Sequence, residues 1–208
     1  MPKPLSSFAN ATHTYSGNNG FSSLAERPHV ALLAMQAIES SSNVEGFMLR
    51  LFIQLFGGSE ALAASVFLAL ASNGPKAAAI AAAAAVVLNP NEILILAALQ
   101  KIDKTNKLTR DNIAHHTWGH CDQLPNALLL IDPRATITDA ATYRYNTFVY
   151  DENDFRALIK ANQTLCSLVM QFSNAFRERD AVERTSKFGE LLASPEIQER
   201  LPRQAPQV

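Results

Sequence analysis

The sequence lacks the features by which secreted, membrane-spanning and disulfide-stabilised proteins are identified. It has two cysteines, Cys121 and Cys166, which are too far apart in the sequence to form a CxxC pair. Residues 1–20 have no apolar core of the kind that a signal peptide needs. The longest apolar run, residues 77–88, is shorter than the roughly 20 residues that span a bilayer. We therefore expect a cytoplasmic protein with reduced thiols and no membrane contact.

An excess of positive charge is also missing. The chain has 18 lysines and arginines against 19 aspartates and glutamates, which gives a net charge of −1. Proteins that bind duplex nucleic acid by neutralising its phosphates usually carry a basic excess, so any contact with nucleic acid must be local. The sequence also has no Gly-x-Ser-x-Gly turn and no glycine-rich phosphate loop, which excludes the enzymes that depend on them.

What the chain does contain is a high proportion of apolar residues. Of its 208 residues, 48% are hydrophobic, and the length suits one domain with tails. We expect a disordered N-terminal arm over residues 1–24, which has few periodic apolar groups. One helical domain over 25–183 and a polar C-terminal tail over 184–208 follow. The apolar composition favours self-association, and we expect a homodimer.

Apolar residues spaced three and four apart predict a series of helices from Glu26 onward. Turn-forming residues predict breaks between the helices, at 40–43, 57–58 and 73–75. An alanine-rich helix over 76–88 precedes the longest predicted helix, over 91–116. A final long helix is expected to begin at Asp151 or Asn153.

Two segments have the composition of strands instead. Residues 127–131 are a short, continuous apolar run, and residues 142–150 are β-branched and aromatic with partial alternation. We expect them to form an antiparallel pair. The predicted fold class is therefore mainly α, with a small two-stranded β element near the C-terminal part.

One segment carries most of the chemistry that the sequence offers. Residues 110–116, RDNIAHH, are followed directly by TWGHC at 117–121. Arg110 is a fixed cation and His115 an imidazole that titrates near neutral pH, and phosphodiester cleavage uses both. On an ideal helix Asp111 shares a face with His115 and is placed to orient the ring and raise its basicity. Arg110 and His115 point about 140° apart on the same helix.

This segment resembles the motif of the HEPN superfamily, the higher eukaryote and prokaryote nucleotide-binding domains. Its members are helical, commonly dimeric domains, and its ribonucleases carry an arginine, four to six residues and then a histidine. Arg110 and His115 fit the four-residue version, and Asp111 fills the polar position after the arginine. The resemblance, over about residues 26–180, implies a HEPN-like up-and-down helical bundle with Arg110, Asp111 and His115 as catalytic residues.

The reaction that the resemblance implies is metal-independent cleavage of RNA. His115 would take the proton from a ribose 2′-hydroxyl, Arg110 would stabilise the phosphorane, and a 2′,3′-cyclic phosphate would result. The implied protein is a toxin- or defence-like endoribonuclease without a cofactor. Its partners would be RNA, a second copy of the chain and a cognate regulatory protein. The sequence leaves open an alternative, a non-catalytic helical module for RNA binding or dimerisation.

A purely structural interpretation of the same residues also stays open. Lys107 and Asp111 can pair at i,i+4 on a solvated helix face. His115 and His116 can end a helix, because its C-terminal dipole favours cationic side chains. We expect Trp118 to be a packing anchor.

A zinc site is the remaining interpretation of this segment. The side chains that bind zinc elsewhere are close together here: His115, His116, His120 and Cys121. No second pair of cysteines or histidines at ligand spacing accompanies them, and Cys166 is isolated. We therefore expect no metal.

Overall fold

The computed structural model describes residues 2–8, 13–20 and 22–202. The chain divides into two compact units: unit 1 is residues 1–41 and 106–162, and unit 2 is residues 42–105 and 163–208. Three long helices contribute residues to both units: α2 (Pro28–Phe56), α5 (Pro90–His115) and α7 (Glu152–Arg177). The prediction of a mainly helical chain with a small antiparallel sheet is confirmed.

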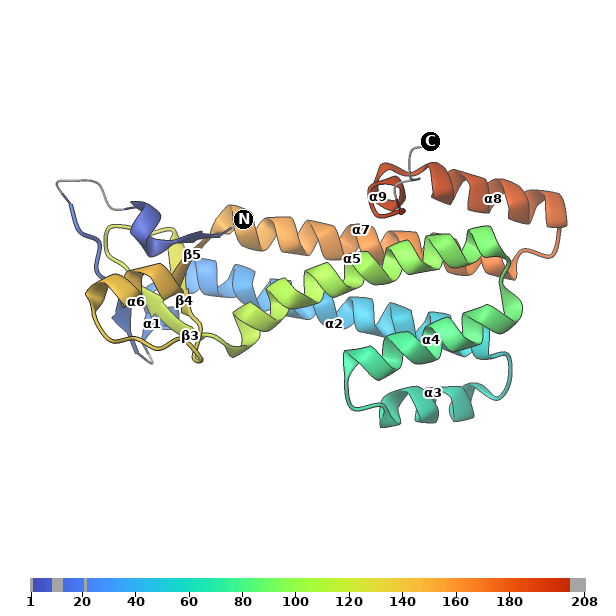
Figure 1. The fold of residues 1–208 in the computed structure, drawn as a ribbon, viewed down its shortest axis with the longest axis horizontal. Helices are drawn as coiled ribbons and strands as arrows, with labels where there is room; N and C mark the ends of the chain where they lie inside the picture. The colour runs from blue at the N-terminus through green and yellow to red at the C-terminus, as the bar shows by residue number, and fades with distance from the viewer. Residues whose placement is uncertain (1, 9–12, 21, 203–208) are drawn as a thin grey trace, which may run out of the picture. The chain divides into compact units, whose positions relative to one another are not determined.

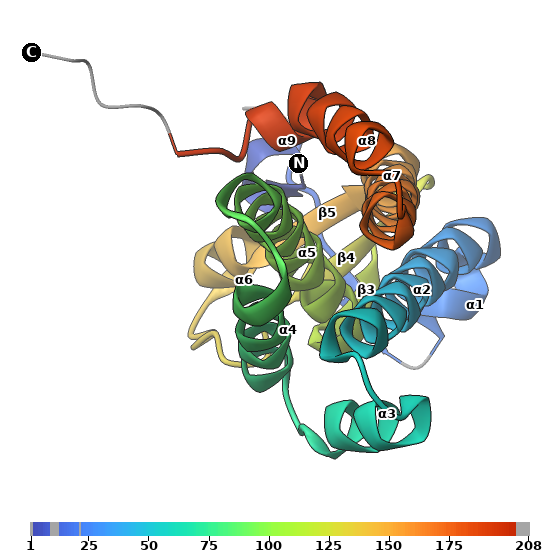
Figure 2. The ribbon, with the colours of Figure 1, turned by 90° about the vertical axis from the view of Figure 1, so that its right-hand side faces the viewer.

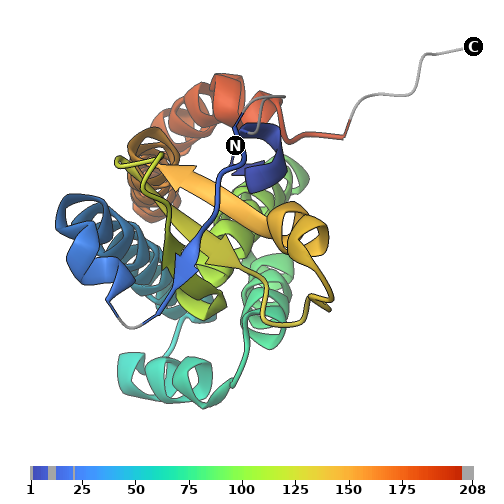
Figure 3. The ribbon, with the colours of Figure 1, turned by 90° about the vertical axis from the view of Figure 1, so that its left-hand side faces the viewer.

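Unit 1 is built around a five-stranded antiparallel sheet (Figure 3). The strands across the sheet are, in order, β1 (Lys3–Pro4), β5 (Thr147–Asp151), β4 (Ala127–Ile131), β3 (Thr117–His120) and β2 (Asn18–Asn19). In the centre, Leu129 of β4 is paired with Gly119 of β3 and with Val149 of β5. All five residues of β4 are buried, because both faces of the sheet are covered.

The two faces of the sheet belong to separate apolar cores. Leu128 and Leu130 lie in one core, where they meet Phe155 of α7. Leu129 lies in the other core with Leu5, which is in the short 3₁₀ helix η1 (Leu5–Phe8). The period-2 alternation of strand side chains divides a continuous apolar run between two cores in this way.

Two predictions for unit 1 are corrected by the structure. Described residues of the expected N-terminal arm form β1, η1, β2 and α1 (Ser23–Glu26), and Leu5 is fully buried. Their few apolar groups suffice because the edge strands β1 and β2 pair with an existing sheet. The strand expected at 142–150 starts only at Thr147. Residues Ala140–Asn146 form helix α6 instead, capped by Asp139, whose carboxylate accepts a hydrogen bond from the Thr142 amide at 2.8 Å.

The break predicted at 40–43 is also absent from the described structure, because α2 continues through it. The hydroxyls of Ser40 and Ser41 both donate to the carbonyl of Ala37, at 2.8 and 3.2 Å. Both hydroxyls accept hydrogen bonds from the buried Asn162 amide of α7, at 2.9 Å each. The hydroxyls of these serines, which favour a turn in an isolated segment, thus have hydrogen-bond partners inside a helix.

Unit 2 contains helices only among its described residues (Figure 2). Besides parts of α2, α5 and α7 it has α3 (Glu60–Ala69), α4 (Asn73–Val87), α8 (Ala181–Ala193) and α9 (Pro195–Gln198). Gly57, with φ of 62°, ends α2 at the break that the sequence predicted, and the Ser59 hydroxyl caps α3 by accepting from the Leu62 amide. Within the described residues, no helix has the length together with the apolar composition that a membrane span requires.

The polar tail expected at 184–208 is corrected as well. Residues 184–193 are part of α8, whose Phe188 and Leu191 are buried, and Ile197 of α9 is fully buried. These apolar residues recur at helical spacing among many charged ones, so the segment is amphipathic rather than merely polar. The part of the predicted tail at 203–208 lies outside the described residues.

Candidate functional site

The candidate site lies at the C-terminal end of α5, where the chain passes into β3 (Figure 1). Ile113, in the last turn, is fully buried in the same core as Leu128 and Leu130. The side chain of Asn112 forms a hydrogen bond with the hydroxyl of Tyr150 in β5. Burial raises the pKa of Tyr150, and this hydroxyl is therefore protonated near neutral pH. These contacts fix the end of the helix against the sheet.

The structure brings together two of the three predicted catalytic residues. Arg110 Nη1 lies 3.0 Å from Asp111 Oδ1, and both side chains are partly exposed. His115, just over one turn further along, is exposed. No hydrogen bond or ion pair joins Asp111 to His115 in the described part of the chain. The carboxylate that the sequence placed beside the imidazole holds the guanidinium instead.

The helix geometry explains this division. Ile113 faces the core, and the opposite side of α5 carries Asp111 and His115 together with the exposed Leu108. Arg110 lies on the flank, about 140° from His115 around the helix axis. Within one chain, therefore, the cation and the imidazole point to different sides.

A second ion pair stands beside the helix end. Thr117 is paired with Ile131, which places His116 and Asp132 next to each other where β3 begins and β4 ends. Arg134 donates to Asp132 from Nε at 3.0 Å and from Nη2 at 3.1 Å. These hydrogen bonds lower the pKa of Asp132 to about 2. The side chain of Arg134 is 83% exposed, so its outer edge faces solvent.

His116 differs in environment from its neighbour His115. Its Nδ1 is buried and has no hydrogen-bond partner among the described residues. Burial lowers the pKa of His116. The carboxylate of Asp132 raises this pKa, while the charges of Arg134 and His115 lower it further. The neutral ring of His116 is thus favoured, while the ring of His115 is exposed.

The arrangement can act chemically on a phosphate. An exposed imidazole can transfer protons, and the guanidinium groups of Arg110 and Arg134 can stabilise negative charge on phosphate oxygens. The sequence had not indicated Asp132, Arg134 or the burial of His116. The sequence feature that could have indicated them is the predicted strand at 127–131. If this strand pairs with the segment that follows His116, Asp132 lies beside His116.

The side chains that the zinc interpretation uses do not converge in the described part of the chain. They contain no group of three or more His, Cys, Asp or Glu side chains that could hold a metal ion. His120 Nδ1 lies 3.2 Å from the Ser23 hydroxyl. Cys121 is fully buried, and its thiol donates to Gln123 Oε1 at 2.9 Å. The potential ligands therefore point to different neighbours.

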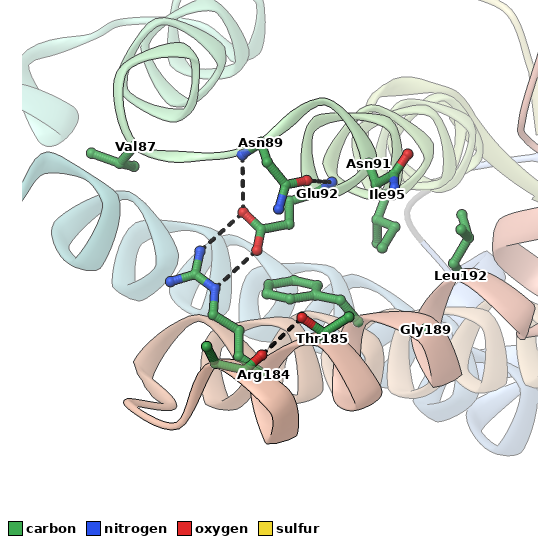
Figure 4. Close-up of a pocket in the computed structure, with 11 residues that line it drawn as sticks. Val87, Asn89, Asn91, Glu92, Ile95, Arg184, Thr185, Gly189 and Leu192 are labelled. Atoms are coloured by element: carbon green, nitrogen blue, oxygen red, sulfur yellow. Dashed lines mark hydrogen bonds and ion pairs between the residues drawn. The ribbon is translucent and has the colours of Figure 1, made fainter.

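A pocket of about 390 Å³ in unit 2 is a second place to look for chemistry (Figure 4). The carboxylate of Glu92 is almost completely buried and accepts two hydrogen bonds from Arg184, both at 2.9 Å. It also accepts from the Asn89 amide at 3.1 Å, and the Asn89 side chain accepts from the Glu92 amide in return. Figure 4 shows Glu92 enclosed by these partners. The Glu92–Arg184 ion pair joins α8 to the start of α5, and its role is structural rather than catalytic.

Comparison with known proteins adds no further assignment. The chain matches no family model, no curated protein and no solved structure.

Proposed function

We propose that the protein is a metal-independent endoribonuclease whose active site is formed by the C-terminal end of α5. The observation that carries this proposal is the exposed His115, just over one helical turn from an arginine that Asp111 holds in place. The helix end is fixed by Ile113, so both groups have defined positions. The resemblance of Arg110, Asp111 and His115 to the HEPN motif supports the choice of RNA.

The reaction follows from these groups. His115 removes the proton from a ribose 2′-hydroxyl, and the oxygen forms a bond to the adjacent phosphorus. The bond from phosphorus to the 5′-oxygen breaks, and that oxygen takes a proton from water. Arg110 stabilises the charge on the phosphorane oxygens, a contribution that can reach about 3 kcal/mol. The products are a 2′,3′-cyclic phosphate and a 5′-hydroxyl.

A homodimer completes the proposed site. Because Arg110 and His115 point about 140° apart on one helix, one chain alone does not direct both at the same phosphate. Two α5 ends related by a two-fold axis place Arg110 of one copy opposite His115 of the other. Arg134 then supplies a further phosphate contact at the rim.

The first test is cleavage of labelled RNA in the presence of EDTA. We expect cleavage by the wild-type protein and a loss of about 100-fold or more in Arg110→Ala and in His115→Ala. The matched control is His29→Ala, which removes an exposed histidine of the same unit that pairs with Glu152 at 3.3 Å. Full dependence on added metal, or equal activity in all three variants, would contradict the proposal.

Mixing the two inactive variants tests the composite site. In a mixed dimer of Arg110→Ala and His115→Ala, one of the two sites has both an intact arginine and an intact histidine. Random pairing then restores about a quarter of the wild-type activity. If each site uses residues of one chain only, the mixture stays inactive.

A non-catalytic module for RNA binding or dimerisation is the second candidate. The 3.0 Å contact between Arg110 and Asp111 favours the dimerisation form of this candidate over cleavage, because the guanidinium is already neutralised within the chain. This candidate predicts RNA binding or dimer formation without any cleavage product, and Arg110→Ala would then change affinity alone.

A further inference from the structure

Unit 1 contains a second cavity, of about 500 Å³. Its walls come from β1, η1, the loop between β3 and β4, the end of β5 and the start of α7. None of its described lining residues belongs to the proposed RNA-cleaving site. Sites for small molecules occupy roughly 300–1,000 Å³, so the cavity is large enough for a ligand.

The floor of this cavity is apolar. Ala127 and Val149 are buried in one core with Leu129, and Phe8 and Leu124 pack against that core. Apart from Leu129, all of these side chains line the cavity. An aliphatic group of a ligand that contacts this floor is therefore removed from water, which favours binding.

The walls carry two opposite charges that are not paired with each other. Lys3 pairs with Val149 across the sheet, and Asp151 lies two residues further along β5, so the three side chains share one face. Diagonal neighbours of this kind lie about 7–8 Å apart. Within the residues that the structure describes, no ion pair joins Lys3 to a carboxylate.

The carboxylate of Asp151 is held in a fixed position. Its Oδ1 accepts hydrogen bonds from the amides of Asn153 and Asp154, at 2.8 and 3.0 Å, and thereby caps α7. Its Oδ2 has no hydrogen-bond partner among the described residues. The capped end of α7 thus presents one carboxylate oxygen for a donor on a ligand.

Two carboxamides complete the lining. The side chains of Asn126 and Asn153 line the cavity and have no hydrogen-bond partner in the described part of the chain. Each carboxamide offers both donors and an acceptor, so they can bind a carboxylate or an ammonium.

The separation of the two charges selects the class of ligand. An anion would lie beside the carboxylate of Asp151, and a simple amine would lie beside the ammonium of Lys3. A neutral molecule would pair with neither charge. A small zwitterion pairs with both, because its ammonium and its carboxylate form charge-assisted hydrogen bonds at opposite ends of the cavity.

We propose that this cavity binds a free α-amino acid with an aliphatic side chain. Asp151 Oδ2 accepts from the ammonium of the ligand, and Lys3 Nζ donates to its carboxylate. The aliphatic side chain lies on the floor, against Phe8 and Leu124. The site does not depend on RNA cleavage, since it shares no residue with the proposed catalytic groups.

The test is isothermal titration calorimetry of the full chain with L-leucine and two analogues. Leucinamide keeps the ammonium and lacks the carboxylate, whereas N-acetylleucine keeps the carboxylate and lacks the ammonium. We expect the wild-type protein to bind leucine at least about tenfold more tightly than either analogue, because each analogue leaves one wall charge unpaired.

Two variants assign the charges to the residues. Lys3→Met should bind leucine at least about tenfold more weakly and no better than leucinamide. Asp151→Asn should also bind leucine about tenfold more weakly and no better than N-acetylleucine, while asparagine retains the helix cap. The matched controls in unit 1 are Asp139→Asn, the same substitution at the cap of α6, and Lys160→Met at an exposed position of α7. Both should bind leucine as the wild type does.

Circular dichroism checks that each variant keeps the wild-type helix content. The proposal would be overturned if the wild-type protein bound none of leucine, valine and methionine at millimolar concentrations. Equal affinity of the wild type for leucine and both analogues would also overturn it, since the wall charges would then take no part. Wild-type affinity for leucine in both Lys3→Met and Asp151→Asn would place the ligand elsewhere.

Discussion

Unit 1 and unit 2 use the same three long helices in different ways. In unit 1 these helices pack on a sheet, and unit 1 contains a buried amide network around Asn162 and a corner of histidines and ion pairs at the end of α5. In unit 2 they join four further helices around a core rich in phenylalanine, with one buried ion pair, Glu92–Arg184. The candidate site therefore belongs to unit 1, and the nearly fully buried carboxylate of Glu92 belongs to unit 2.

The sheet of unit 1 gives the candidate site fixed surroundings. Catalytic groups need positions fixed by packing and by hydrogen bonds, which a sheet with two covered faces provides. Substitutions at the Glu92–Arg184 pair of unit 2 should therefore change stability without removing a group of the candidate site.

The largest effect is expected for Arg184→Ala in unit 2. This substitution leaves the nearly fully buried Glu92 carboxylate without its cation, and we expect a loss of about 3–5 kcal/mol in the free energy of unfolding. Chemical denaturation measures the loss, and hydrogen exchange should locate it in α5 and α8. The control is Val182→Ala, an exposed neighbour in α8, which should change stability by less than about 0.5 kcal/mol. A loss as small as that of the control would show that the ion pair is dispensable.

The corresponding change in unit 1 is Asn162→Ala. It removes the amide that donates to Ser40 and Ser41 and that accepts from Asn106 at 3.0 Å. Because these groups are then buried without their partner, we expect a loss of about 2 kcal/mol. Gln163→Ala, at the next and exposed position of α7, is the control. An unchanged unfolding midpoint for Asn162→Ala would mean that water replaces the amide, and unit 1 would be less tightly packed than described.

Each unit has a helix that is capped by an aspartate, so the same substitution can be compared in the two units. Asp139 caps α6 in unit 1, and Asp180 caps α8 in unit 2 by accepting from the amides of Val182 and Glu183 at 2.9 and 2.8 Å. Replacing either aspartate by alanine should cost about 1 kcal/mol. The corresponding asparagine variants should keep most of the stability, since asparagine caps as well as aspartate. An unchanged unfolding midpoint for Asp139→Ala would mean that its hydrogen bond to the Thr142 amide does not persist in solution.

The elements that could be predicted from the sequence are those whose signal is local. The spacing of apolar residues predicted α5 to within one residue at each end and the start of α7, and the break predicted at 57–58 is real. The serines at 40 and 41 misled, because their partner Asn162 lies more than a hundred residues away in the sequence. The strands β1 and β2 were missed for a similar reason. Each of these strands has only two residues, which is too short for a recognisable sequence pattern. They are strands because β1 pairs with β5 and β2 pairs with β3.

The candidate site shows the same division between local and distant signals. Arg110 and His115 were found by their spacing in one helix, and their exposure at its end agrees with a role in binding. The predicted partner of Asp111 was His115, and this prediction was wrong, because the neighbouring Arg110 pairs with the Asp111 carboxylate instead. Asp132 and Arg134 could not be found, since their place beside His116 depends on the pairing of β3 with β4.

The smallest effect is expected at this corner of unit 1 and concerns pH. The folded pKa of His116 is lowered, so the unfolded chain takes up this proton first as the pH falls. The stability due to the neutral ring is therefore fully present above about pH 6.5 and is lost as the pH falls through the folded pKa.

The substitution Arg134→Ala removes a positive neighbour of His116 and should therefore raise the pKa of His116. It also removes the hydrogen bonds to Asp132, so the pKa of Asp132 should rise from about 2 toward its ordinary value. NMR titration of both side chains measures these shifts, with Arg156→Ala as a control at an exposed ion pair of α7. Unchanged titration of Asp132 in Arg134→Ala would mean that the two hydrogen bonds do not persist in solution, and Arg134 would then be free to bind a phosphate without first leaving a partner.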